Sequence, residues 1–203
     1  YMNQLMAEIA GILGKEDKQA AYQAKFENIK QTFLNTHVTF EDGNLVIKSG
    51  EGDQNYQFMY SAGKGGVWEN NSQTSLLWML KLGFYDSEEM RDAAQKLLIE
   101  NIKNENPDPS SIRAQAEKNT LAVGFLGSNV IAPVLTDIGN PQVSYDLLLQ
   151  DGQPSWLFEV KAGATTVWER WNSYSPGIGF GDSEMNSFNH YAYGSVVEWM
   201  YRY

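Results

Sequence analysis

One stretch of the chain places a carboxylate and a guanidinium between two indole rings: Gly163-Ala164-Thr165-Thr166-Val167-Trp168-Glu169-Arg170-Trp171. Burying a lone charge is very costly, so a buried Glu169–Arg170 pair would need a partner for each charge. Aromatic rings beside a carboxylate are also typical of carbohydrate chemistry, because sugars offer apolar C–H faces to rings and carboxylates cleave glycosidic bonds. From the residues alone, the stretch is either a carbohydrate site built on Glu169 or a structural ion pair enclosed by core aromatics.

The composition limits the classes of function. The 203 residues suit one domain with a sizeable core. A net charge of −10 argues against nucleic acid as a partner, because binding phosphate requires a basic surface. No apolar run approaches the roughly 18 residues that span a bilayer, so no membrane partner is expected. There is no cysteine, and His37 and His190 lie in unrelated contexts, so neither a metal nor a cofactor is expected. The compartment stays open.

Hydrophobic periodicity predicts a mainly helical chain. The expected helices cover residues 2–13, 16–35, 72–82, 87–103 with Asp86 as the N-cap, 125–138, 142–150 and 187–203. Two β-prone runs within 38–47 flank Asp42-Gly43, which favours a small β-hairpin. The polar, glycine-rich residues 49–66 are expected to form a long loop.

The spacing of these helices predicts an architecture. Short joints within pairs and longer loops between pairs indicate helical hairpins arranged around an axis, as in a toroid. A ring of six hairpins needs twelve helices, whereas about seven are expected here, and half a ring would leave apolar edges exposed. We therefore expect residues 1–203 to form a single partial domain, the C-terminal half of the ring. The missing N-terminal half of the same chain is its expected partner.

Five ordered segments carry a resemblance to a known family. The first is Ser72-Gln73-Thr74, and the second is Val123–Gly127 followed by Ala132–Leu135. The third is Tyr145–Gln150 followed by Pro154–Leu157. The last two are Thr165–Trp171 and Asn186–Tyr201. Thr165–Trp171 resembles a Thr-Thr-Ile-Trp-Glu-Arg-Trp signature, and Asn186–Tyr201 resembles a stretch that reads Met-Asn-Ser-Phe-Asn-His-Tyr-Ala-Tyr-Gly. Together the segments resemble bacterial α-L-rhamnosidases of glycoside hydrolase family 78, over most of the chain and most strongly from residue 121.

The resemblance implies a fold, a reaction and roles for residues. The fold is the all-α (α/α)6 toroid, and the reaction is the removal of terminal α-L-rhamnose from rhamnosides by an inverting hydrolase. Glu169 takes the role of the general base, and His190 that of a hydrogen-bond partner of rhamnose. Trp168, Trp171 and Trp156 are candidate substrate contacts, with packing as the alternative for each.

An inverting enzyme also needs a general acid, with the two carboxyl groups roughly 6.5–9.5 Å apart. The family's acid lies upstream of the base in an Asp-x-x-x-Glu-Arg type motif, and this motif does not occur here. The acidic residues near the expected loops are Asp53, Asp137, Glu159, Asp182 and Glu184. None has the family's context for the acid, so we expect residues 1–203 alone to have little or no hydrolase activity.

Two other functions stay open at this point. One is an (α/α)6 glycoside hydrolase with a different sugar specificity, which would keep the chemistry of Glu169 and change the substrate. The other is a helical sugar-binding or scaffolding module without catalysis. The two differ in whether a second carboxyl group faces Glu169.

Overall fold

The computed structural model describes residues 1–48, 58–60, 64–66, 70–107, 109, 114, 116–181 and 184–203. The helices in these ranges are α1 (Met2–Ile12), α2 (Glu16–His37), α3 (Gln73–Leu82), α4 (Glu88–Lys103), α5 (Phe125–Ser128), α6 (Ile131–Asp137), α7 (Pro141–Leu149), α8 (Trp156–Lys161), the 3₁₀ helix η2 (Ala192–Ser195) and α9 (Val196–Arg202). The strands are β1 (Val38–Glu41), β2 (Asn44–Ile47), β3 (Phe58–Tyr60), β4 (Lys64–Gly66), β5 (Tyr174–Ser175) and β6 (Gly179–Phe180). Apart from β3 and β4, the loop expected at 49–66 lies outside the described residues.

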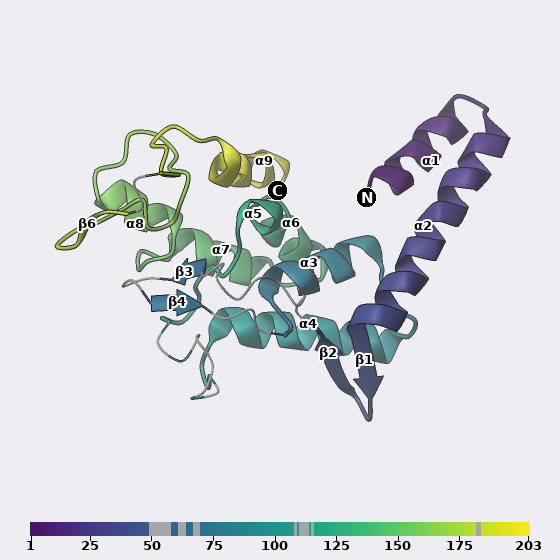
Figure 1. Ribbon diagram of the computed structural model, residues 1–203, viewed down its shortest axis with the longest axis horizontal. Helices are drawn as coiled ribbons and strands as arrows, with labels where there is room; N and C mark the ends of the chain where they lie inside the picture. Colours follow the sequence, from purple (N-terminus) through teal and green to yellow (C-terminus); the bar gives the residue numbers. More distant parts are fainter. Residues whose placement is uncertain are drawn as a thin grey trace.

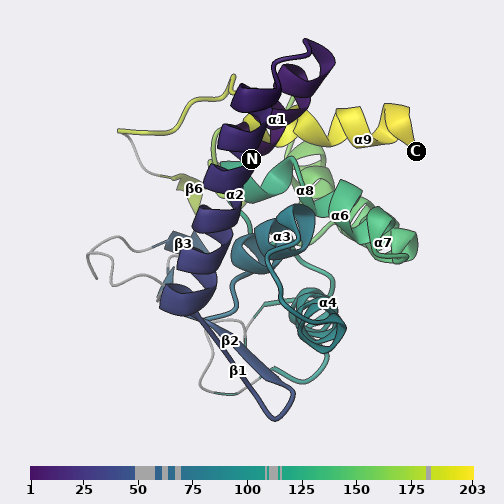
Figure 2. The ribbon, with the colours of Figure 1, turned by 90° about the vertical axis from the view of Figure 1, so that its right-hand side faces the viewer.

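The helices pair into hairpins, as the sequence predicts. Helix α1 packs back along α2, α3 packs on α4, and α6 packs on α7 (Figure 1). The α1–α2 hairpin projects from one end of the molecule, and α8 lies with β6 at the other end. In the view turned by 90°, α2 runs down to the β1–β2 hairpin, and α4 lies beneath α3 (Figure 2). Within the described ranges, no helix is both long enough and apolar enough to cross a membrane.

Local sequence signals account for most of the helix and strand ends. Ser72 caps α3 by accepting a hydrogen bond from the Ser75 N–H at 3.2 Å. Gly83 ends the same helix in the left-handed conformation, with φ of 67°. The β1–β2 turn places Asp42 and Gly43 at positive φ, 51° and 77°, which is what a two-residue hairpin turn requires. The predicted Asp-Gly hairpin is therefore confirmed.

The N-cap of α4 differs from the prediction by one residue. Ser87, rather than Asp86, accepts the hydrogen bond from the Met90 N–H, at 3.1 Å. The side chain of Asp86 instead lies 3.8 Å from the ammonium group of Lys30 on α2. Aspartate and serine are comparable N-cap residues, so the sequence alone does not choose between two adjacent candidates.

Two predicted helices are interrupted. The helix expected at 125–138 is divided into α5 and α6, and Pro133 lies in the first turn of α6, where a missing N–H is tolerated. The helix expected at 187–203 was wrong over residues 187–191, which are irregular, and its helical part consists of η2 and α9. The backbone N–H groups of Ser187 and His190 bond to residues of the Glu169 loop, and the Ala192 N–H donates to His190 Nδ1 rather than to a carbonyl four residues earlier.

One main core lies under these elements. Most of its buried members come from β2 (Leu45, Ile47), α3 (Leu76, Leu77, Met79), α4 (Ala94, Leu98, Ile102), α6 (Ile131, Val134, Leu135), α7 (Val143, Leu147) and the C-terminal segments (Trp171, Tyr193). A second cluster of Ala132, Val196 and Trp199 attaches α9 to α6. Trp171, which ends the Trp-Glu-Arg-Trp stretch, is therefore part of the main core.

Gln73 is a buried polar residue that joins two elements of this core. Its side chain is 1% exposed, and its Nε2 donates to Asn101 Oδ1 at 3.0 Å and to the Thr120 carbonyl at 3.2 Å. Its Oε1 accepts a hydrogen bond from the Ala122 N–H at 2.7 Å. A buried amide is tolerated when its donors and acceptor are used, and here they fix the segment that leads to α5.

Replacing Gln73 with leucine is expected to lower the free energy of unfolding by about 2–3 kcal/mol, because buried backbone groups at 120 and 122 lose their partners. The matched control is Gln31→Leu, since Gln31 is exposed and its side chain donates to Glu27 on the same helix. We expect the control to change the free energy by less than about 0.5 kcal/mol. Urea unfolding followed by circular dichroism measures both variants. Equal stability of the Gln73→Leu variant and the unchanged chain would contradict the role of Gln73.

Candidate active site

Glu169 lies in the loop that follows α8, and its main chain and side chain both pair with Ser187. The Glu169 N–H donates to the Ser187 carbonyl at 2.9 Å. The Ser187 N–H donates in return to Oε2 of the Glu169 carboxylate at 2.7 Å. Among the described residues, no lysine or arginine forms an ion pair with this carboxylate. The structural Glu169–Arg170 ion pair, the alternative left open by the sequence, is therefore not formed.

Further hydrogen bonds extend this pairing along both segments. The His190 N–H donates to the Val167 carbonyl at 2.9 Å. The hydroxyl of Thr166 donates to the Phe188 carbonyl. The loop carrying Glu169 and the segment carrying His190 therefore lie side by side, and the two motifs quoted from the sequence form one site.

Trp171 fixes the C-terminal end of the loop in the core. Its ring stacks on Tyr193, with centroids 3.8 Å apart and an interplanar angle of 23°. Its indole N–H donates to the Val123 carbonyl at 2.8 Å. The Trp156 ring meets Trp171 edge-on at 5.6 Å, and the Trp156 N–H donates to the Tyr193 carbonyl at 2.8 Å. These contacts join four of the five sequence motifs through indole rings.

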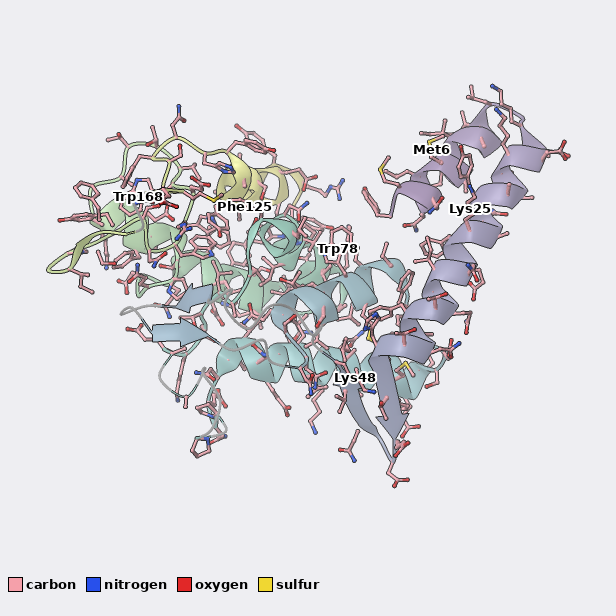
Figure 3. The ribbon with its side chains drawn as sticks, viewed as in Figure 1. Met6, Lys25, Lys48, Trp78, Phe125 and Trp168 are labelled. Carbon is pink, nitrogen blue, oxygen red and sulfur yellow. The ribbon has the colours of Figure 1, made fainter. Side chains whose placement is uncertain are left out.

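Burial distinguishes the three tryptophans that are candidate sugar contacts. Trp168 is 4% exposed and packs edge-on against Phe188 at 5.4 Å, and Trp171 is 9% exposed. Figure 3 shows Trp168 within the group of loops around α8. Stacking on a sugar requires an open ring face, so for Trp168 and Trp171 the geometry favours packing over the expected substrate contact. Trp156 is only partly buried.

His190 lies in irregular chain rather than on a helix, and it is held by aromatic neighbours. Its ring stacks on Phe125 at 4.6 Å and 12° and on Tyr191 at 5.4 Å and 5°. Its Nδ1 accepts a hydrogen bond from the Ala192 N–H at 3.3 Å. In the neutral ring this bond assigns the proton to Nε2, which is then the available donor.

Phe125 was not expected at the site. It begins α5, is 41% exposed and also contacts Tyr193 at 5.2 Å (Figure 3). The sequence feature that could have indicated Phe125 as a site residue is its position within the Val123–Gly127 motif. Gly127 in that motif allows α5 to lie against α3, because a Cβ there would be 2.7 Å from Thr74 Oγ1.

Gly194 allows a second segment of the chain to approach closely. A Cβ at Gly194 would lie 3.2 Å from Cγ2 of Val167, so the close neighbour is the Glu169 loop.

The acidic residues that the sequence pointed to have different environments. Asp53 and Asp182 lie outside the described residues. Asp137 accepts a hydrogen bond from the Tyr203 hydroxyl at 2.7 Å, and Glu184 is exposed. Glu159 on α8 is 4% exposed, and burial raises the pKa of its carboxyl to about 8, while the Trp168 backbone N–H partly offsets that shift.

The part of the chain that the structure describes contains no candidate metal site. There, no three side chains of histidine, cysteine, aspartate or glutamate are grouped so that they could hold an ion. The chemistry available at the site is that of carboxyl groups, an imidazole and aromatic rings.

Comparisons with known proteins identify the family of the chain. A family model described as the bacterial alpha-L-rhamnosidase six-hairpin glycosidase domain matches residues 1–203. An alpha-L-rhamnosidase of Formosa agariphila is 34% identical over 197 residues, which is 97% of this chain and 17% of that protein. An alpha-L-rhamnosidase of Streptomyces avermitilis is 58% identical over 81 residues, which is 40% of this chain and 8% of that protein. The chain thus spans about a sixth or less of the length of these relatives.

Solved structures agree with this result. The Streptomyces avermitilis alpha-L-rhamnosidase complexed with L-rhamnose has a TM-score of 0.72 and 35% identity, over 98% of this chain and 16% of that one. The native enzyme of Aspergillus terreus has a TM-score of 0.76 and 26% identity, over 98% of this chain and 19% of that one. The predicted resemblance and the predicted (α/α)6 fold class are both confirmed. The chain belongs to the bacterial α-L-rhamnosidases, and residues 1–203 are part of their six-hairpin glycosidase domain.

Proposed function

We propose that the chain supplies the general base, Glu169, to an inverting glycoside hydrolase that removes terminal α-L-rhamnose. The observation that carries the proposal is the environment of the Glu169 carboxylate. Oε2 is fixed by the Ser187 N–H, while Oε1 has no hydrogen-bond partner among the described residues. One oxygen is oriented and the other is left to accept a proton, as base catalysis requires.

In the proposed reaction, Glu169 takes a proton from a water molecule whose oxygen bonds to the anomeric carbon. The glycosidic C–O bond breaks on the opposite face, and the leaving oxygen receives a proton from a second carboxyl group. The second carboxyl group belongs, in this proposal, to chain outside residues 1–203, together with the remaining hairpins. The length of the relatives supports this division, since the chain spans 17% of the Formosa agariphila enzyme.

His190 is the proposed hydrogen-bond donor to rhamnose. Its Nδ1 is used by the Ala192 N–H, so Nε2–H is the group left for a sugar hydroxyl. Rhamnose is favoured over another sugar because the Streptomyces avermitilis relative, 35% identical, was crystallised with L-rhamnose. Of the three tryptophans, only the partly buried Trp156 keeps surface for a sugar contact in this proposal.

Replacing Glu169 with glutamine, in the complete enzyme that contains residues 1–203, is expected to lower kcat by about 10³-fold, because the amide cannot accept the water's proton. Hydrolysis of an aryl α-L-rhamnoside measures the change. Glu198→Gln is the matched control, since Glu198 is exposed and pairs with Arg202 at 3.1 Å on α9. The control should retain full activity. Full activity of the Glu169→Gln variant would exclude Glu169 as the base.

The same assay on residues 1–203 alone is expected to show no turnover above background, because the proposed acid is absent. Turnover that disappears on Glu169→Gln would instead show that an acid exists within these residues. A sugar-binding module without catalysis would give no turnover in either the isolated chain or the complete protein.

Replacing His190 with alanine in the complete enzyme is expected to raise KM for the aryl rhamnoside by about 5- to 10-fold, the loss of one hydrogen bond of about 1 kcal/mol. His37→Ala is the control, since His37 is exposed at the end of α2. Initial rates over a range of substrate concentrations separate KM from kcat. An unchanged KM in the His190→Ala variant would argue against a contact with the sugar.

A further inference from the structure

Ser173 closes the turn that follows Glu169. It is 0% exposed, and its hydroxyl oxygen accepts a hydrogen bond from the Arg170 N–H at 3.1 Å. The Ser173 N–H donates in return to the Arg170 carbonyl, also at 3.1 Å, which is the hydrogen bond of a β-turn. The chain immediately after the proposed base is therefore held in a defined turn.

The carbonyl of Ser173 joins this turn to the segment that carries Ser187. Asn186 Nδ2 donates to this carbonyl at 2.9 Å, and the Gly181 N–H donates to it at 2.8 Å. Both lone pairs of the carbonyl oxygen are therefore used. Asn186 directly precedes Ser187, whose N–H orients Oε2 of Glu169 at 2.7 Å. The side chain next to that N–H is thus attached to the turn that follows Glu169.

The Asn186 bond fixes one end of the pairing between the two segments. At the other end, the Val167 carbonyl accepts a hydrogen bond from the His190 N–H at 2.9 Å. The Glu169–Ser187 pair lies between these two attachments, because rising residue numbers in one segment meet falling numbers in the other. Without the Asn186 amide, the attachment on one side of the pair is lost, so the Ser187 N–H is less firmly aimed at the carboxylate.

Stability alone does not account for the amide of Asn186. Its Oδ1 is buried and has no hydrogen-bond partner among the described residues. A buried acceptor without a partner is destabilising. If the amide were removed, the Ser173 carbonyl would still accept a hydrogen bond from the Gly181 N–H. An apolar side chain at position 186 is therefore expected to cost little stability, which leaves the effect on the Ser187 peptide as the role of the amide.

We propose that Asn186 is a positioning residue, which holds the Ser187 peptide near the Ser173 carbonyl and so keeps the carboxylate of Glu169 oriented for base catalysis. This inference rests on the proposed function of Glu169 as the base. Asn186 acts through Ser187 and does not contact the sugar in this proposal. A small misplacement of a reacting group can cost about 100-fold in rate, so loosening the Ser187 N–H should lower kcat.

The first test replaces Asn186 with alanine in the complete enzyme and measures hydrolysis of an aryl α-L-rhamnoside. We expect kcat to fall by about 10-fold and KM to stay within about twofold, because the base is misplaced while the sugar contacts remain. Asn44→Ala is the matched control, since Asn44 is exposed in the β1–β2 hairpin and its amide donates to the Asp42 carbonyl at 3.4 Å. The control should retain full activity.

Asn186→Leu is measured alongside, so that the test does not depend on one variant folding well. Leucine fills the space of the amide and lacks the donor, and an apolar group of similar shape is tolerated where both polar partners are no longer needed. We expect the same loss of kcat as in Asn186→Ala. Circular dichroism spectra of both variants should match the spectrum of the unchanged enzyme.

A double-mutant cycle with Glu169→Gln separates positioning of the base from a general effect on the fold. If Asn186 acts through Glu169, adding Asn186→Ala or Asn186→Leu to Glu169→Gln should leave the residual kcat within about twofold, because no base remains to be misplaced. If the amide only supports the fold, the same factor of loss should appear with and without the base.

Two results would overturn the inference. One is an unchanged kcat in both Asn186→Ala and Asn186→Leu. The other is a loss of kcat that has the same size in the Glu169→Gln background as in the unchanged enzyme. Failure of the proposed base is a separate result, because it would appear as activity retained by the Glu169→Gln single variant.

Discussion

The reciprocal pairing of Glu169 with Ser187 is the constraint on which the rest of the site depends. Each residue donates its backbone N–H to the other, one to a carbonyl and one to a carboxylate oxygen, at 2.9 and 2.7 Å. Residues 187–191 are irregular, and the Ala192 N–H donates to His190 Nδ1 rather than to the Phe188 carbonyl four residues earlier. The same pairing brings His190 beside the Glu169 loop, so the orientation of the carboxylate and the position of the imidazole have one cause.

The core supports this pairing through indole rings rather than through ion pairs. Trp171 combines stacking on Tyr193 with a hydrogen bond to Val123, and Trp156 bonds Tyr193 from α8. A tryptophan suits such a junction because it offers a large apolar face and one directional donor. The Glu169 loop is thereby attached to the α3–α7 core by packing that needs no charge, which leaves the carboxylate for chemistry.

The sequence predicted the features that arise from nearby residues. Ser72, Gly83 and Asp42-Gly43 act within a few positions, and their helix ends and turn are where expected. The segment at 187–191 was wrong because its helical pattern is overridden by partners about twenty positions earlier, a contact that periodicity does not record. The motifs predicted which segments form the site, but the burial of Trp168 and of Glu159 depends on how α8 and the loop fold back together.

The central claim is that Glu169 activates water on the face of the sugar opposite the leaving group. The most direct measurement is the anomeric configuration of the first sugar released from an aryl α-L-rhamnoside by the complete enzyme, followed by proton NMR before mutarotation. We expect β-L-rhamnose as the first product. Release of α-L-rhamnose first would contradict it, because retention requires a carboxylate that attacks the sugar itself.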